Sequence, residues 1–114
     1  MTCSVSETVY LNRDNTIQLV LSSDGVAVAD LSAITRIVVT VGSTTIDSAV
    51  VGSSVIWWTD QDTYDGALVD VLKLKLGHQS LSAGAYEDCR ITYYDPARPN
   101  GDVWSEDMTI EVKA

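Results

Sequence analysis

Acidic side chains crowd one stretch of this 114-residue chain, TDQDTYDGALVD at positions 59–70. Asp60 and Asp62 have the spacing of the first two ligands of an EF-hand calcium loop. Tyr64 then occupies the third ligand position, and Val71 stands at the twelfth, where such a loop uses a bidentate glutamate. We therefore expect these residues to form an acidic loop between two strands, without a bound metal.

The other residues with reactive side chains are few, because the chain has one histidine, His78, and two cysteines, Cys3 and Cys89. A serine hydrolase needs a histidine beside a serine on a strained turn, and the sequence lacks a Gly-x-Ser-x-Gly motif. Cys89 falls in an apolar strand pattern, which lacks the electropositive surroundings of a reactive thiolate. Three or four His/Cys zinc ligands cannot be assembled. We expect no enzyme, no metal site and no cofactor.

Two pairs of adjacent aromatic residues, Trp57–Trp58 and Tyr93–Tyr94, are a stronger signal. Successive side chains of a strand point to opposite faces, so one member of each pair faces away from the core. Trp and Tyr are favoured anchors in protein interfaces. We predict that Trp58 or Tyr94 is an outward anchor that lies against another protein chain. The alternative is that a loop of the same chain covers the outer face.

Two further segments are candidates for the same interface. The loop DPARPNGD at 95–102 is stiffened by two prolines, and its Asn-Gly pair favours a tight turn. The first residues, which include one of the cysteines, form an arm that is free to order on a neighbour. The predicted interface residues are Trp58, Tyr94, Pro96, Arg98, Pro99, Asn100 and Cys3.

The elements that position these residues are strands, because apolar residues recur with a period of two. The pattern predicts seven main strands, an eighth around 44–47, and a short turn at 31–34. Tyr86 and Cys89 are out of phase with each other, so a bulge is expected at 87–88. In the segment LVDVLKLKLG at 68–77, Leu68 shares a face with the core residues Leu72 and Leu74, and Val69 and Val71 lie on the other face. Residues inside the predicted core are Ile17, Leu19, Leu21, Ile37, Val39, Leu72, Leu74, Ile91, Trp104, Met108 and Ile110.

This pattern predicts an all-β fold: a single-domain antiparallel β-sandwich, immunoglobulin-like or jelly-roll-like, with seven to eight strands. We assign residues 1–6 to an N-terminal arm and residues 7–114 to the sandwich domain. The composition, 46% hydrophobic and 20% charged, is that of a globular protein.

The formal net charge of −9 argues against nucleic acid as a partner. No stretch approaches the roughly 18–20 apolar residues that cross a bilayer, so no membrane association is expected. The first ten residues do not have the basic and apolar parts of a signal peptide. We therefore expect a protein made in a cytoplasm, with both cysteines as free thiols.

An early strand here leads to an Asp-Gly turn at 24–25 and then to an Asp-Leu-Ser-Ala corner at 30–33. Later, a Leu…Gly-Ala-Tyr corner at 81–86 opens the penultimate strand. In these features, the chain resembles small immunoglobulin-like β-sandwich proteins of tailed-bacteriophage virions, which include head decoration proteins and domains of tail or baseplate proteins. The resemblance implies a non-enzymatic structural protein of the virion, made in the bacterial host cytoplasm without a signal peptide.

The partners implied by the resemblance are other virion proteins, either major capsid or tail proteins. A capsid decoration, or cement, protein is the favoured function, and a tail or baseplate adaptor is the alternative within the same class. A carbohydrate-binding adhesion module is the alternative from another class, with Trp58, Trp104 or Tyr94 as the surface on which a glycan stacks. Self-association into a homo-oligomer stays open.

Overall fold

The computed structural model describes residues 6–23 and 26–114 of the chain. Cys3, the rest of the expected arm up to residue 5, and the Asp-Gly turn at 24–25 lie outside the described residues. Within the described part the strands are β1 (Ser6–Tyr10), β2 (Ile17–Leu19), β3 (Ser22–Ser23), β4 (Val26–Ala27), β5 (Arg36–Val41), β6 (Thr44–Asp47), β7 (Ile56–Tyr64), β8 (Ala67–Leu74), β9 (Gly84–Asp95) and β10 (Arg98–Lys113). One short helix, α1 (Ser48–Val51), follows β6.

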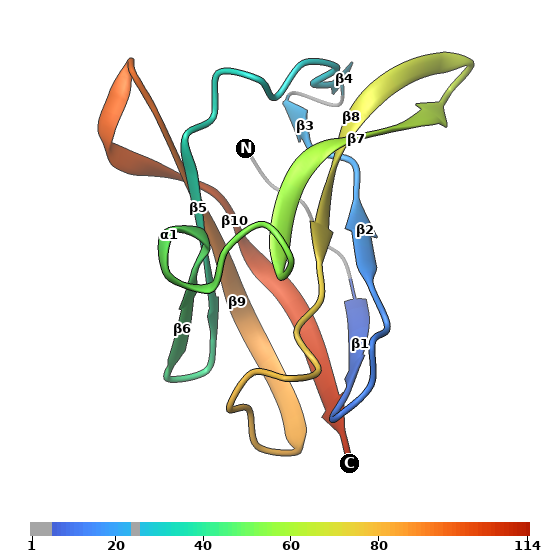
Figure 1. The fold of residues 1–114 in the computed structure, drawn as a ribbon, viewed down its shortest axis with the longest axis vertical. Coiled ribbons are helices and arrows are strands. Elements are labelled where there is room, and N and C mark those ends of the chain that lie inside the picture. The colour runs from blue at the N-terminus through green and yellow to red at the C-terminus, as the bar shows by residue number, and fades with distance from the viewer. Residues whose placement is uncertain (1–5, 24–25) are drawn as a thin grey trace.

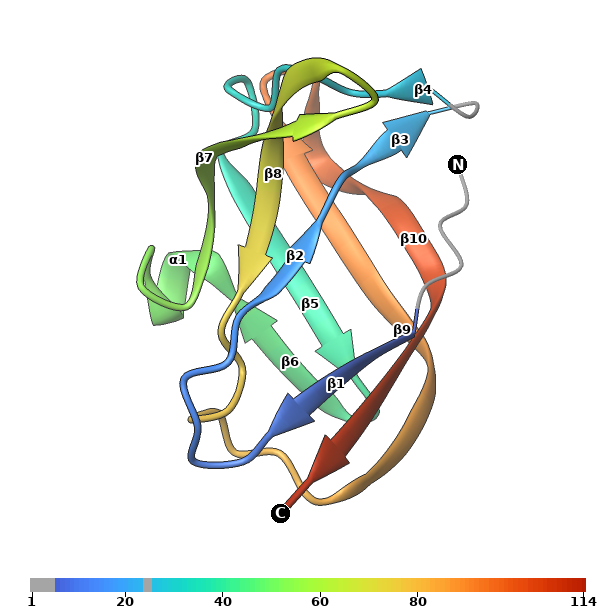
Figure 2. The same ribbon diagram turned by 90° about the vertical axis from the view of Figure 1, so that its right-hand side faces the viewer.

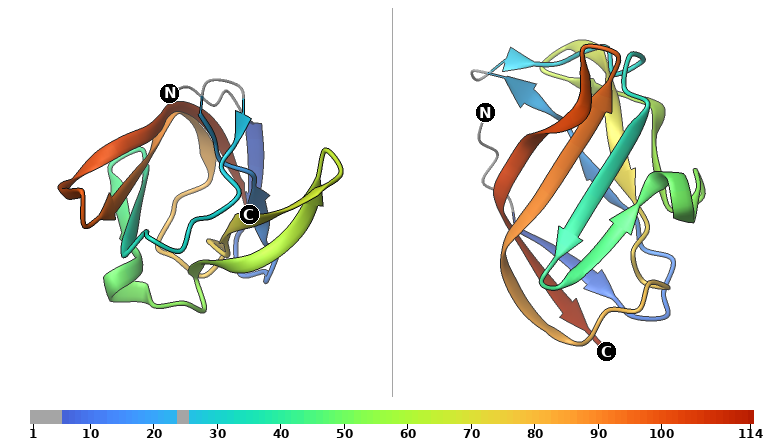
Figure 3. Two further views of the ribbon diagram at one scale, coloured as in Figure 1. Left: turned by 90° about the horizontal axis from the view of Figure 1, so that it is seen from above. Right: turned by 90° about the vertical axis from the view of Figure 1, so that its left-hand side faces the viewer.

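Two sheets face each other across the core (Figures 1 and 2). The larger sheet has the order β1-β10-β9-β5-β6, and the smaller has the order β2-β8-β7. Strands β3 and β4 form a separate hairpin. The views in Figure 3 show the layers from above and the larger sheet from its outer side. The predicted all-β, single-domain sandwich is confirmed.

The strand order can be compared with that of immunoglobulin domains. In such domains one sheet contains the neighbours G-F-C-C′ and the other contains B-E-D, and here β10-β9-β5-β6 and β2-β8-β7 take those places. One pairing differs from the antiparallel arrangement that we expected, because β1 runs parallel to β10 from Ser6 opposite Thr109 to Tyr10 opposite Lys113. A parallel pair is possible here because almost the whole chain connects the two strands.

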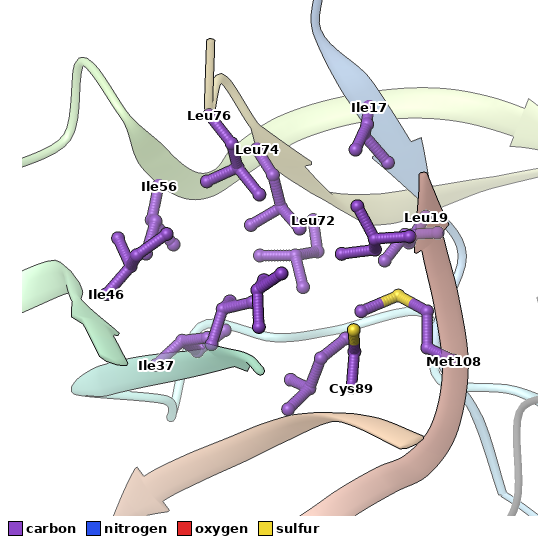
Figure 4. Packing of buried hydrophobic residues seen from close by; sticks show 14 of the residues in the cluster. Ile17, Leu19, Ile37, Ile46, Ile56, Leu72, Leu74, Leu76, Cys89 and Met108 are labelled. Carbon is purple, nitrogen blue, oxygen red and sulfur yellow. The ribbon is translucent and has the colours of Figure 1, made fainter. Parts of the chain in front are cut away.

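The core lies between the sheets and is filled by alternate residues of both (Figure 4). All eleven residues that the period of two placed inside are buried in this cluster. Cys89 is fully buried among them as a free thiol. Burial raises the pKa of the Cys89 thiol, because the surrounding apolar side chains disfavour the thiolate. The thiol therefore stays protonated and fills space in the core.

The bulge expected at 87–88 is present. Met108 pairs with Cys89 while Ile110 pairs with Tyr86, so β9 holds one extra residue at this point. Asp88 takes up the irregularity with a φ of 58°. The bulge turns Tyr86 toward the core, where its ring packs and its hydroxyl donates a 2.7 Å hydrogen bond to the carbonyl of Ser82. This contact resembles the tyrosine corner of immunoglobulin domains.

The β9–β10 connection differs from the predicted turn. Asp95 pairs with Arg98, so the chain reverses at Pro96 and Ala97 rather than at the Asn-Gly pair. The segment 99–101 instead forms a bulge within β10, because the register shifts between Arg98 and Asp102. Gly101 does adopt the positive φ that the sequence suggested, at 80°.

The β7–β8 hairpin corrects two predictions. The acidic stretch is a strand and not a loop, because Asp60 pairs with Val71 and Asp62 with Val69 before the chain turns after Tyr64. The inward phase also changes along β8. Leu68 is 64% exposed, whereas Val69 and Val71 are 3% and 0% exposed. The upper part of this hairpin curls away from the larger sheet (Figure 1). The buried side chains therefore lie on one face of β8 at Leu72 and Leu74 and on the opposite face at Val69 and Val71.

Candidate functional site: an apolar groove with an acidic rim

Of the adjacent tryptophans, Trp58 is the inward member. Its indole packs against the core, and Nε1 donates to the carbonyl of Ile34 at 3.3 Å. Trp57 pairs with Lys73 on the outer face, and its Nε1 donates to Asp60 Oδ2 at 2.9 Å. The predicted outward orientation of Trp58 is therefore wrong. Trp58 lies two positions after the buried Ile56, on the same side of β7, and the register with β8 shifts only beyond Trp57.

Tyr94 does lie on the outer face, opposite the buried Tyr93, but its own chain covers it. The guanidinium of Arg36 stacks on the Tyr94 ring at 4.6 Å from its centroid. From the other side Gly101 approaches so closely that a Cβ there would lie 2.7 Å from a ring carbon. Tyr94 is thus half-buried between β5 and β10. Its role as an interface anchor stays a prediction, and the contacts match the alternative of an own-chain cover.

Arg98 is held at the tip of the β9–β10 hairpin by neighbouring acids. Its Nη1 lies 2.9 Å from Asp95 Oδ2, and its Nε lies 3.6 Å from Asp102 Oδ2. Its guanidinium also lies over the Tyr93 ring, at 5.4 Å from the centroid. A partner would have to replace these contacts. Pro96, Pro99 and Asn100 are exposed at the same tip, and their part in an interface stays a prediction, as does that of Cys3 outside the described residues.

The glycan alternative loses one of its three candidate residues. Trp104 is 4% exposed and packs against Tyr93 with 4.7 Å between ring centroids, so no sugar can stack on it. Trp57 and Trp58 together line a hollow of about 180 Å³ beside α1. Glycan stacking on Trp58 or Tyr94 stays a prediction.

The groups that could carry chemistry lie apart. His78 Nε2 contacts Asp14 Oδ1 at 2.6 Å on the surface, and this contact lowers the pKa of the Asp14 carboxyl. Among residues 6–23 and 26–114 no group of three or more His, Cys, Asp or Glu side chains is placed to hold a metal ion. In the same residues no helix is long and apolar enough to span a membrane.

Three of the six large apolar side chains that are exposed among the described residues belong to the β3–β4 and β7–β8 hairpins, and the other three, Tyr10, Val50 and Val103, lie elsewhere. Figures 1 and 2 show these two hairpins together at one end of the sandwich. Val26, Tyr64 and Leu68 are 69%, 51% and 64% exposed. A groove of about 340 Å³ runs between the two hairpins. One wall is formed by Val26, Ala27 and Ala29, and the other by Tyr64, Asp65, Ala67 and Val69. We call this the hairpin groove.

Asp70 fixes the two walls of the hairpin groove relative to each other. Its backbone N–H donates to the carbonyl of Ala29, and its Oδ2 accepts from the N–H of Leu31, both at 2.8 Å. Gln61 Nε2 donates to the second oxygen of Asp70 at 3.1 Å. Leu31 is buried beneath this contact. The groove is therefore bounded by hydrogen-bonded backbone on both sides.

One aspartate lines the hairpin groove and a second lies beside it on β7, and together we call them the acidic rim. Asp65 lies in the groove wall, and Asp62 is the register partner of Val69. The hydrogen bond from Gln18 to Asp62, 2.7 Å long, holds the pKa of that carboxyl below its usual 3.8, so Asp62 is charged at neutral pH. Lower on the same face, Trp57 and Lys73 lower the pKa of Asp60 in the same way.

Sequence reasoning missed this site. The two walls come from segments about forty positions apart, and no motif links Val26 to Tyr64. A signal was present in Tyr64 and Leu68, which are apolar residues beside an Asp-Gly turn, where polar residues are usual. Comparison of the chain with protein-family models, curated proteins and solved structures gave no match.

Proposed function

We propose that this chain is a non-enzymatic structural protein of a tailed-bacteriophage virion that attaches to the capsid surface as a decoration protein. The observation that carries the proposal is the exposure of Val26, Tyr64 and Leu68 on the hairpins at one end of a sandwich with a well-formed core; Val26 and Tyr64 line the hairpin groove, and Leu68 lies between the groove residues Ala67 and Val69 in the sequence. Single exposed apolar residues are ordinary, but a group of them beside a groove is typical of an interaction surface. The sequence resemblance supplies the setting of a virion.

The energetics suit attachment in many copies. Burial of one large apolar side chain contributes on the order of 1.5–3 kcal/mol. Three partly exposed side chains give a weak individual contact after the entropic cost of association is subtracted. If one decoration protein also touches its neighbours on a symmetric particle, these weak contacts act together and hold the layer.

The proposal is tested by the location and copy number of the protein in purified particles. Quantitative mass spectrometry of virions should find the chain in proportion to the major capsid protein, and labelled antibody should mark the heads. A copy number that follows the tail proteins would favour the tail or baseplate adaptor. Absence of the chain from washed particles would contradict a virion role.

A pair of variants tests the surface itself. Leu68→Ser and Tyr64→Ser should fold normally, because both side chains are more than half exposed, and should attach poorly to particles that lack the protein. Thr45→Ala, an exposed change on β6 of the other sheet, is the control and should attach like the original protein. Full attachment of both Ser variants would place the interface elsewhere.

A further inference from the structure

We propose that the hairpin groove binds an extended, positively charged segment of a partner protein, with an apolar side chain seated between Val26 and Tyr64 and a lysine or arginine beside Asp62 or Asp65. This inference deepens the proposed function, on which it rests for the identity of the partner. It can be tested without particles.

The shape and lining of the groove support an extended peptide segment. Its volume of about 340 Å³ accommodates one or two side chains and is too small for a folded domain. The walls consist mainly of alanines and valines, whose short side chains leave space for a side chain of a partner. The Tyr64 ring is half-exposed at one side. An aromatic face at the edge of an apolar slot can hold both an aliphatic side chain and, by a cation–π contact, a cation.

The charge of the rim selects a cationic occupant. The β7–β8 hairpin carries four aspartates, Asp60, Asp62, Asp65 and Asp70, and one cation, Lys73. Lys73 is already paired, since its Nζ lies 3.0 Å from Asp60 Oδ2. Asp65 is exposed in the groove wall, and Asp62 is exposed beside it, where its carboxylate accepts hydrogen bonds from Gln18 and from the N–H of Thr63. A lysine or arginine of a partner would neutralise these carboxylates.

A second copy of the same chain is a poor occupant for the same reason. The chain has a net charge of −9, and docking one groove on another would bring the same aspartates together. Like charges that meet across an interface oppose binding, so self-association through this end is disfavoured. A basic partner segment meets both requirements of the groove, its apolar lining and its acidic rim.

The direct test uses two synthetic peptides and the isotope-labelled protein. The probes are acetyl-Lys-Leu-Lys-Leu-Lys-amide and acetyl-Glu-Leu-Glu-Leu-Glu-amide, titrated while amide chemical shifts are recorded by NMR. The lysine peptide should change the amide chemical shifts of residues 26–29 and 64–69, and these changes should saturate as its concentration rises. The glutamate peptide should leave the same shifts unchanged. No binding by the lysine peptide, equal binding by both, or shifts spread over all acidic parts of the surface would overturn the proposal.

Variants separate the two parts of the site. Tyr64→Ser should raise the Kd of the lysine peptide by about fivefold or more, because the contact with the Tyr64 ring is lost. Asp62→Asn and Asp65→Asn keep the side-chain shape and should each weaken it by a similar factor at low salt, with less effect at high salt. Glu87→Gln, an exposed change on β9 of the other sheet, is the matched control and should bind like the original protein. Unchanged binding by the three groove variants would contradict the assignment.

The outcome is distinguishable from that of the proposed function. If the peptide binds the groove but the chain is absent from particles, the virion role fails while the groove assignment stands. If the chain decorates particles but the lysine peptide does not bind, the groove assignment fails alone.

Discussion

At the scale of single residues, the contact between Gly42 and Tyr86 closes the corner that begins β9. Gly42 has a φ of 60°, and a Cβ there would lie 2.8 Å from the Tyr86 ring. We predict that Gly42→Ala lowers the free energy of unfolding by about 2–4 kcal/mol, from backbone strain and from overlap with the ring. Urea denaturation measures the change.

A matched glycine separates these two effects. Gly66 also has a positive φ, of 82°, but nothing lies within 4 Å of the added Cβ. Gly66→Ala should therefore cost only about 1–2 kcal/mol from backbone strain. Equal losses in the two variants would show that Tyr86 moves aside without cost and that the close contact does not stabilise the corner.

The ion pair of Arg36 and Asp47 gives a prediction in pH. The two side chains form a bidentate contact, and the Arg36 guanidinium holds the pKa of Asp47 below its usual 3.8. A carboxyl whose pKa is lowered on folding stabilises the protein above its unfolded pKa, and that stability is lost as the pH falls through the folded value. Asp47→Asn should therefore be less stable than the original protein at pH 7.

The difference should shrink as the pH falls below about 4, because Asp47 then becomes neutral as well. Thermal melts of both proteins between pH 2.5 and pH 7 provide the comparison. Through Oδ1, Asn can keep the cap that Asp47 supplies to the N–H of Ala49, but its amide nitrogen replaces the oxygen that accepts from Arg36 Nη2. The variant therefore removes the bidentate ion pair and leaves the cap. A stability difference that is constant over this range would contradict the assigned role of the charge.

At the scale of elements, the β7–β8 hairpin carries the sharpest prediction, because the sequence pattern and the structure assign opposite faces. Val71 is fully buried, so Val71→Ala should destabilise the protein by about 2 kcal/mol from lost burial and a residual cavity. Leu68 is 64% exposed, so Leu68→Ala should change stability by less than about 0.5 kcal/mol. Chemical denaturation of the two variants would refute the change of phase if their order were reversed.

The same hairpin shows where sequence reasoning ends. A period of two identified the strands and the core from Ile17 to Ile110, because apolar residues recur at alternate positions of each strand, even where a neighbour such as Val38 or Val71 is buried as well. The pattern assigned the wrong faces to Leu68 and Val69. Which face of the β7–β8 hairpin is buried depends on how distant segments pack against it, and a local period of two does not contain that information. The bulge at 87–88 was predictable, since Tyr86 and Cys89 were visibly out of phase.

Other elements were missed for identifiable reasons. Helix α1 had its signals in the sequence, with Asp47 as N-cap and Gly52 as the positive-φ residue after it, but it is only one turn long. The parallel pairing of β1 with β10 joins the two ends of the chain, and no local pattern indicates which edge β1 selects. The hairpin groove likewise depends on non-local packing of small residues such as Ala27 and Ala29.

At the scale of the whole molecule, the β9–β10 hairpin has a different surface from the end formed by the β3–β4 and β7–β8 hairpins. The tip of β9 and β10 is polar and internally paired through Arg98, whereas the end formed by β3–β4 and β7–β8 leaves apolar side chains and aspartates in water. A partner that binds the first must break ion pairs, and a partner that binds the second gains burial and neutralises charge. Under the proposed function, we therefore expect attachment through the hairpin groove.

Hydrogen–deuterium exchange of the protein free and bound to its particle tests this placement most directly. Peptic fragments that cover 26–31 and 62–70 should exchange more slowly in the bound protein, while fragments that cover 95–102 exchange at similar rates in both states. Protection confined to 95–102, with unchanged exchange at 26–31 and 62–70, would contradict the account and return the interface to the β9–β10 hairpin.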